Sequence, residues 1–385
     1  MLLIKNGHIK TMAGADIVGG SVLIGDDGKI RAVGVVETEF QDVTVIDAGG
    51  RIVTPGLVEA HCHTGLSCSS LRWEGAEYNE KGGDPVTPQM RAIDGFNPID
   101  EKLDEAIEHG VTTACAGPGS ANVVGGTFGA FKLVGRRVDD MILRHPIAMK
   151  CAFGENPKSF YGQNGKTPST RMGTAALLRD LLTKAKNYLA AKEAGKEPAY
   201  DAKLEAMLPV IKKEIPLKAH AHRADDILTA IRIAKEFDVK LTLDHCTEGA
   251  LIADILAEEG YPAFVGPFFG DKTKPELSNK SVATPGILHK AGVSVSIITD
   301  ASVTPLKYLS LCAGLAYAEG LDYEEAWRAI TINPARGTGI DDRVGSLEPG
   351  KDADVVIWTA DPLTTVGACA YVTIIDGKII HSLMA

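Results

Sequence analysis

The chain lacks any uninterrupted apolar run of the length that crosses a membrane, which is about 20 residues. Its first residues turn polar too soon for a signal peptide. The seven cysteines are an odd number without regular spacing, which argues against a disulfide framework and for a reducing compartment. We therefore expect a cytoplasmic protein with no membrane partner.

An excess of positive charge is also missing. The net charge is −10 at pH 7, so the sequence carries no basic footprint for a nucleic acid and we expect no such partner. No solenoid-type repeat is present. With 385 residues, of which 45% are hydrophobic, the chain can build one large domain with an ample core and a smaller appendage.

Two histidines one residue apart, His61 and His63, are the most informative feature that is present. They end an apolar stretch that predicts a strand, where side chains alternate, so both imidazoles project to the same side. Neutral imidazole is the commonest protein ligand for zinc-type ions, and the pair therefore predicts a divalent-metal site. For this short pattern alone, two ordinary histidines are the alternative.

Four further polar residues lie in or end later apolar stretches: Lys150, His220, His245 and Asp300. Each stretch is typical of a short buried parallel strand, and helical patterns such as 225–235 lie between them. In a barrel of eight βα units all strand ends meet at one face, so these side chains can share one metal centre with the histidine pair. The eight strand candidates are 56–63, 111–116, 129–133, 147–153, 217–222, 241–245, 262–265 and 293–300.

This pattern predicts an α/β fold, a (β/α)8 TIM barrel with a closed parallel sheet over residues 55–344. Residues 1–54 and 345–385 instead show short strands and tight-turn signals such as Asn6-Gly7. Neither end has enough strands to bury a face alone. We therefore expect both termini to form one small composite β-sandwich domain beside the barrel.

Four segments carry a resemblance to a known family: 55–63, 331–336, 345–356 and 372–380. Through them the chain resembles the amidohydrolase superfamily of metal-dependent hydrolases, and within it the branch of imidazolonepropionase-like and prolidase-like enzymes. The resemblance implies cleavage of a C–N amide bond in a small molecule, either a linear acyl-amino acid or dipeptide or a cyclic amide. It also implies a divalent metal, with zinc as the expected ion, and a homo-oligomer.

The resemblance implies roles for the residues at the strand ends. His61, His63, His220 and His245 take the places of the metal histidines. Asp300 takes the place of the carboxylate that contacts metal and acts as general base toward the attacking water. Asp300 or His245 then protonates the leaving nitrogen.

Lys150 has three interpretations. A lysine inside an apolar strand must be neutralised or paired, because burying a free ammonium is costly. Relatives with a lysine at the end of strand four form a carbamate there that bridges two ions, which makes Lys150 a metal ligand. The alternatives are a side chain that reaches the surface or pairs with an acid, and a site in which Glu155 supplies the fourth-strand carboxylate. The number of ions, one or two, depends on this choice.

Two long polar loops, 66–97 and 154–174, predict lids or substrate walls, and the glycine-rich loop 117–126 predicts a backbone-lined pocket wall. Arg171 could bind a substrate carboxylate, since guanidinium forks match carboxylates, although a surface arginine is the alternative. His222 shares a side with His220 and either contacts substrate or turns outward from its loop. The substrate-binding candidates are His222, Arg171, Tyr161, Asn122 and Glu155.

Two other functions compete with amide hydrolysis. Superfamily deaminases, and imidazolonepropionase itself, resemble one another in carrying a glutamate three residues after the strand-five histidine. Arg223 stands at that place here, which argues against both activities. A non-enzymatic assembly protein tends to lose metal ligands, whereas all the expected positions are filled.

Overall fold

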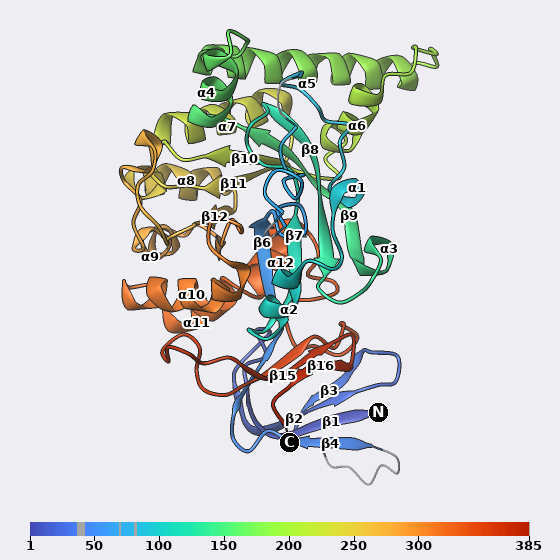
Figure 1. Ribbon diagram of the computed structural model, residues 1–385, viewed down its shortest axis with the longest axis vertical. Helices are drawn as coiled ribbons and strands as arrows, with labels where there is room; N and C mark the ends of the chain where they lie inside the picture. Colours follow the sequence, from blue (N-terminus) through green and yellow to red (C-terminus); the bar gives the residue numbers. More distant parts are fainter. Residues whose placement is uncertain (37–42, 69–70, 81–82, 385) are drawn as a thin grey trace.

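The structure is a computed structural model that describes residues 1–36, 43–68, 71–80 and 83–384. It contains two sheets of eight strands, a barrel sheet and a terminal sheet. The terminal sheet lies below the barrel sheet in Figure 1 and holds both ends of the chain.

The barrel sheet contains its eight strands in chain order, from β6 to β13. The predicted strands 111–116 and 241–245 coincide with β7 and β11, and the other six overlap a strand with different ends. The α/β fold with a nearly closed eight-stranded barrel is confirmed. The strands are β6 (Leu57–Cys62), β7 (Val111–Ala116), β8 (Val124–Lys132), β9 (Ile142–Ala152), β10 (Leu217–Ala221), β11 (Leu241–His245), β12 (Ala263–Val265) and β13 (Val295–Ile297).

The expectation that all eight strands run parallel is wrong for β8, which pairs antiparallel with both β7 and β9. The connection from β7 to β8 is too short for a parallel crossover, which needs a dozen or more residues and usually a helix. Gly126 in β8 has φ +125°, and a Cβ there would lie 2.3 Å from the Met90 carbonyl oxygen. Only glycine therefore lets the preceding loop pack against this strand.

A side chain closes the barrel between its first and last strands. Glu59 in β6 is fully buried, and its carboxylate accepts hydrogen bonds from the Thr299 amide at 2.8 Å and hydroxyl at 2.5 Å. The same carboxylate accepts from the His61 amide at 2.8 Å. The His63 amide also donates to the Ala301 carbonyl. These bonds fix the residues that precede His61 and Asp300 against each other.

Helices surround the barrel, and α4 and α5 lie farthest from the terminal sheet (Figure 1). Within the described ranges, no helix joins the length and the apolar character that a membrane span requires. The helices are α1 (Ala92–Gly95), α2 (Glu101–Ile107), α3 (Val138–Met141), α4 (Glu155–Gln163), α5 (Arg171–Glu193), α6 (Ala202–Ile211), α7 (Ala224–Phe237), α8 (Ala253–Glu259), α9 (Thr284–Ala291), α10 (Leu309–Ala318), α11 (Tyr323–Arg328) and α12 (Ile332–Thr338).

The terminal sheet joins strands from both ends of the chain, as predicted. Strand β5 pairs antiparallel with β14, and β1 pairs with β2, β4 and β5. Ile4, Val22 and Val355 belong to one buried apolar cluster that both ends share. The strands are β1 (Leu2–Ile9), β2 (Ile17–Ile24), β3 (Ile30–Gly34), β4 (Thr44–Asp47), β5 (Ile52–Pro55), β14 (Val355–Trp358), β15 (Ala370–Ile375) and β16 (Lys378–Ser382).

Candidate metal centre

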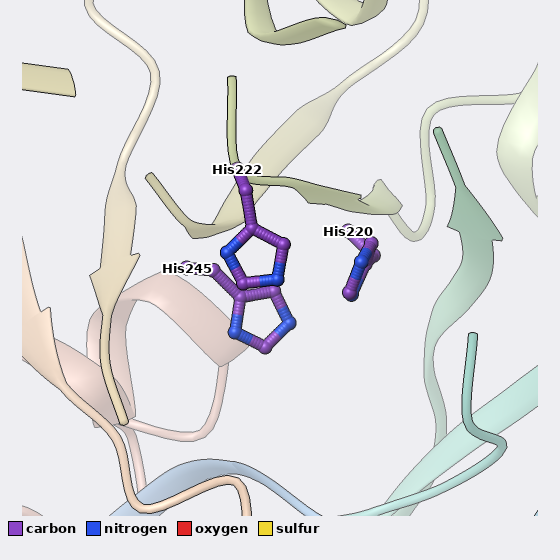
Figure 2. A group of neighbouring side chains, drawn as sticks. All are labelled: His220, His222 and His245. Atoms are coloured by element: carbon purple, nitrogen blue, oxygen red, sulfur yellow. The ribbon is translucent and has the colours of Figure 1, made fainter. Parts of the chain in front are cut away.

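The ends of four barrel strands bring five histidines and one aspartate together. The ligand atoms of His61, His63 and Asp300 lie within 4.8 Å of one another. Those of a second group, His220, His222 and His245, do the same, and Figure 2 shows their rings converging from β10 and β11. The rings of His61 and His245 are 5.3 Å apart, so the groups adjoin. The predicted convergence of strand ends is present.

All five imidazoles are held in the same way, with Nδ1 against an oxygen. Carbonyl and carboxylate oxygens can only accept, so a proton on Nδ1 suits these contacts at His61, His63 and His245 and would leave Nε2 for a metal. The two hydroxyl partners allow the same arrangement at His220 and His222. The contacts are His61 with Asp244 Oδ2 at 3.0 Å, His63 with the Gly117 carbonyl at 2.8 Å, His220 with Ser120 Oγ at 2.9 Å, His222 with Thr247 Oγ1 at 2.7 Å and His245 with the Gly266 carbonyl at 2.9 Å.

The histidines of the second group have lowered pKa values that suit them to bind a cation. Burial lowers the pKa of His245 to about 3, and burial together with neighbouring imidazoles and Lys274 holds the pKa of His220 and His222 well below its ordinary value. All three rings are therefore neutral, which is the form that binds metal. His245 Nε2 is buried and has no hydrogen-bond partner among the described residues. A metal ion would satisfy this orphaned nitrogen, so the residues fit the group.

Asp300 supplies the carboxylate of the first group. Its Oδ1 lies 3.2 Å from His63 Nε2 and 3.5 Å from His61 Nε2. Burial raises the pKa of Asp300, but its contacts with these two histidines outweigh burial and hold that pKa well below its usual range. Asp300 and His245 both have positive φ, +50° and +73°, in the left-handed region that is uncommon outside glycine. Such strain is concentrated at functional sites.

Lys150 is fully buried beneath the histidines, so it does not reach the surface. Its Nζ lies 3.4 Å from His61 Nε2 and 3.5 Å from Asp244 Oδ2. Burial lowers the pKa of Lys150. The amine is thus paired with an acid and also lies beside His61 of the first group, where a carbamate would have to form.

A cavity of about 590 Å³ opens above the two groups, with His63, His220, His222 and Asp300 among its lining residues. The loop 66–97 contributes a wall, as predicted, although positions 69–70 and 81–82 lie outside the described residues. The predicted loop 154–174 is instead largely helical, since it holds α4 and the start of α5, and residues of α4 line the cavity. The glycine-rich loop 117–126 contributes as well. The loop from β12 to α9 forms the remaining wall. The wall residues include Tyr78, Asn79, Gly119, Ser120, Glu155, Asn156, Phe160, Phe269, Lys274 and Lys280.

A model described as the amidohydrolase family matches residues 52–380. The chain belongs to the amidohydrolase family. A crystal structure of an amidohydrolase from Thermotoga maritima MSB8 is 41% identical with a TM-score of 0.95, covering 99% of this chain and 100% of that one. Among curated proteins, Amidohydrolase tasK of Hapsidospora irregularis is 28% identical over 379 residues, which are 91% of this chain and 38% of that protein. An imidazolonepropionase of Rhizobium rhizogenes is 25% identical over 385 residues, covering 91% and 89%. This amidohydrolase is thus a hydrolase that acts on carbon–nitrogen bonds, in a metal-dependent superfamily.

Three residues predicted to bind the substrate of this amidohydrolase lie outside the cavity wall. Arg171 donates from Nε to Asp226 at 2.9 Å, because that buried carboxylate needs a partner. The Tyr161 hydroxyl donates to Asn122 Oδ1 at 2.6 Å, and Asn122 donates onward to Thr87 at 2.8 Å. Arg171 thus joins α5 to α7, and Tyr161 joins α4 to the glycine-rich loop, while their contact with a substrate stays a prediction. Glu155 and His222 do line the cavity.

Two acidic residues of the centre escaped prediction. Alternation puts Asp244 on the opposite side from His245, but the left-handed backbone at His245 turns the ring to the same side. Asp244 could have been found from its position inside an apolar strand, where a charged residue needs a partner. Glu276 comes from the irregular loop between β12 and α9, where no periodic pattern marks a buried carboxylate.

Proposed function

We propose that this amidohydrolase cleaves an amide C–N bond in a small molecule, either a linear acyl-amino acid or dipeptide or a cyclic amide. The observation that carries the proposal is the convergence of neutral histidine nitrogens and an ionised carboxylate beneath one cavity. This donor set suits a Lewis-acidic ion and a hydrolytic water.

Zinc is the ion we propose, since imidazole and carboxylate donors are its usual protein ligands apart from thiolate. One or two such ions would be held by His61, His63 and Asp300 of the first group and by His220 and His245 of the second, with Lys150 as a further ligand if it forms a carbamate. When bound, such an ion lowers the pKa of water to about 7 and polarises a carbonyl.

The protein's own residues move the protons. Asp300 is ionised and lines the cavity floor, so it can accept the proton of the attacking water. The protonated Asp300 then delivers that proton to the leaving nitrogen, because burial lowers the pKa of His245 to about 3 and its neutral ring has no spare proton to give. Tyr78 stacks on His63 at 5.0 Å between ring centroids and narrows the cavity beside the reacting groups, which helps exclude other water.

Deamination of a heterocycle is less well supported. Arg223, three residues beyond His220, has its guanidinium in an ion pair with Asp225 at 2.9 Å and lies at the start of α7. It supplies no acid to the site. A non-enzymatic assembly role would leave the buried donor set without a purpose.

The test is a screen of metal-reconstituted protein against N-acyl amino acids, dipeptides, cyclic amides and amino-substituted heterocycles. We expect turnover of at least one amide class and loss of turnover after the metal is removed with a chelator. Ammonia release from a heterocycle without amide cleavage would overturn the proposal in favour of deamination. Turnover that survives complete metal removal would overturn the metal-dependent mechanism.

A further inference from the structure

Glu276 faces the second histidine group from a loop that the predicted site does not include. Its carboxylate is buried, and Oε1 lies 3.7 Å from His220 Nε2 and 3.7 Å from His222 Nε2. These separations are too long for hydrogen bonds. They are close to the roughly 3.3 Å expected between two ligand atoms on one tetrahedral zinc with bonds of about 2.0–2.1 Å. Glu276 thus faces both histidines at separations close to those of ligands that share one ion.

The Glu276 carboxylate is fixed by neighbouring polar groups, as the carboxylate ligands of metal sites are. Glu276 Oε2 accepts a hydrogen bond from the Glu155 amide at 2.9 Å, and Lys274 Nζ lies 2.6 Å from Oε1. Lys274 is in turn fixed by Asn156 Oδ1 at 2.9 Å. Ligating carboxylates characteristically have such outer partners, which set their orientation.

His222 is placed and oriented in the same way as His220 and His245, the two predicted ligands beside it. Its ring lies 4.6 Å from that of His245 and 4.7 Å from that of His220 (Figure 2). Thr247 holds its Nδ1, so Nε2 points toward the gap that Glu276 borders. Without Glu276 an ion here would have only neutral imidazoles around it, whereas the first group already contains Asp300.

We propose that His220, His222 and His245 hold a second ion and that Glu276, which faces two of these histidines, supplies its carboxylate ligand. This second-ion site rests on the proposed function, because both require that the protein binds metal. It differs from a carbamate-bridged centre because the second ion does not depend on Lys150. That lysine instead stays an amine paired with Asp244.

The experiment uses the full chain, stripped of metal and reconstituted with Zn²⁺ or with Co²⁺ as a spectroscopic substitute. Bound ions are counted by elemental analysis, affinities come from competition with a chromogenic chelator, and the visible Co²⁺ absorption reports the ligand set. The variants are Glu276→Gln, His222→Gln and Lys150→Met. Asp271→Asn is the matched control, since it removes an exposed carboxylate from the same loop. Circular dichroism and Tm report whether each variant is folded.

We expect two ions in the native protein, in Asp271→Asn and in Lys150→Met. Glu276→Gln should weaken the second ion at least ~10-fold and change the Co²⁺ spectrum, and His222→Gln should lower the count toward one. Two ions of native affinity in both Glu276→Gln and His222→Gln would overturn the assignment. Loss of the second ion in Lys150→Met alone, or a single ion in the native protein, would also overturn it. A native protein that binds no metal would overturn the proposed function as well. If His222→Gln does not fold, Glu276→Gln decides.

Discussion

Lys218 Nζ lies 2.8 Å from Asp244 Oδ1, and the other oxygen of that carboxylate lies 3.0 Å from His61 Nδ1. The lysine and the aspartate are both buried, and the ammonium also lies 4.1 Å from the centre of the Phe264 ring. Burial raises the pKa of Asp244, but Lys218 and His61 outweigh it and hold that pKa well below its usual range. A buried ion pair thus fixes the orientation of His61.

Lys218→Met is expected to destabilise the protein by about 3–5 kcal/mol, because it leaves a buried carboxylate without its main partner. Metal affinity should also fall by roughly 10–100-fold, the usual effect of disturbing a group that orients a ligand. Urea unfolding and chelator competition measure the two effects. Lys184→Met is the control, since Lys184 and Asp180 are an exposed pair and should contribute no more than about 1 kcal/mol. Native-like stability in Lys218→Met would show that Asp244 is stabilised without this lysine.

The sequence predicted the parts of the molecule that follow a regular period. Strands β7 and β11 have the predicted bounds because each is a short apolar run between polar turns. His61, His63, His220 and Asp300 end such runs, so the barrel rule placed them at one face. The reversed direction of β8 could not be found in this way, since apolar alternation is the same in parallel and antiparallel strands.

The errors at the site have a common physical origin, which is local departure from the regular pattern. Asp244 was missed because the left-handed backbone at His245 breaks the alternation of side chains. Glu276 was missed because it reaches the centre from a loop. The ion pair of Arg171 with Asp226 was not predicted, because a buried partner cannot be recognised from sequence distance alone.

His61→Ala should lose bound metal and activity together. The variant removes one Nε2 from the first group and leaves Asp300 and Asp244 without their shared partner. Elemental analysis of protein purified without chelator, beside a turnover assay, measures both. His381→Ala in β16 of the terminal sheet should retain the metal and the activity. Full metal occupancy and turnover in His61→Ala would show that the centre does not use this histidine.

Asp300→Asn should lower turnover at least ~10²-fold while most of the metal stays, since proton transfer by a positioned side chain typically contributes 10²–10⁴-fold. Asparagine tolerates the left-handed backbone at this position, where φ is +50°, so the fold should be preserved. The measurement is kcat beside the metal content of the same sample. Ser302→Ala removes a nearby cavity hydroxyl and should leave kcat within a few-fold of the native value. An active Asp300→Asn enzyme would place the general base elsewhere.

Asp352→Asn should destabilise the protein at neutral pH and lose its effect in acid. The carboxylate accepts from Arg343 at 2.9 Å and lies 3.2 Å from Lys132 Nζ, which comes from β8 and so ties the barrel to the chain's C-terminal region. Burial raises the pKa of Asp352, but Arg343, Lys132 and Lys29 outweigh it and lower the pKa to about 2.

The folded-state pKa is therefore below that of the unfolded chain, about 3.9. The stabilisation is fully present above that value and is lost as the pH falls toward 2. It is on the order of 2 kcal/mol, since one pKa unit corresponds to about 1.4 kcal/mol. Urea unfolding of native and variant protein between pH 7 and pH 3 measures it, with exposed Glu258→Gln as the control. We expect the difference between native and Asp352→Asn to be constant from pH 7 to about pH 5 and then to shrink. A difference that persists unchanged at pH 3 would mean that the carboxylate acts through packing and not through its charge.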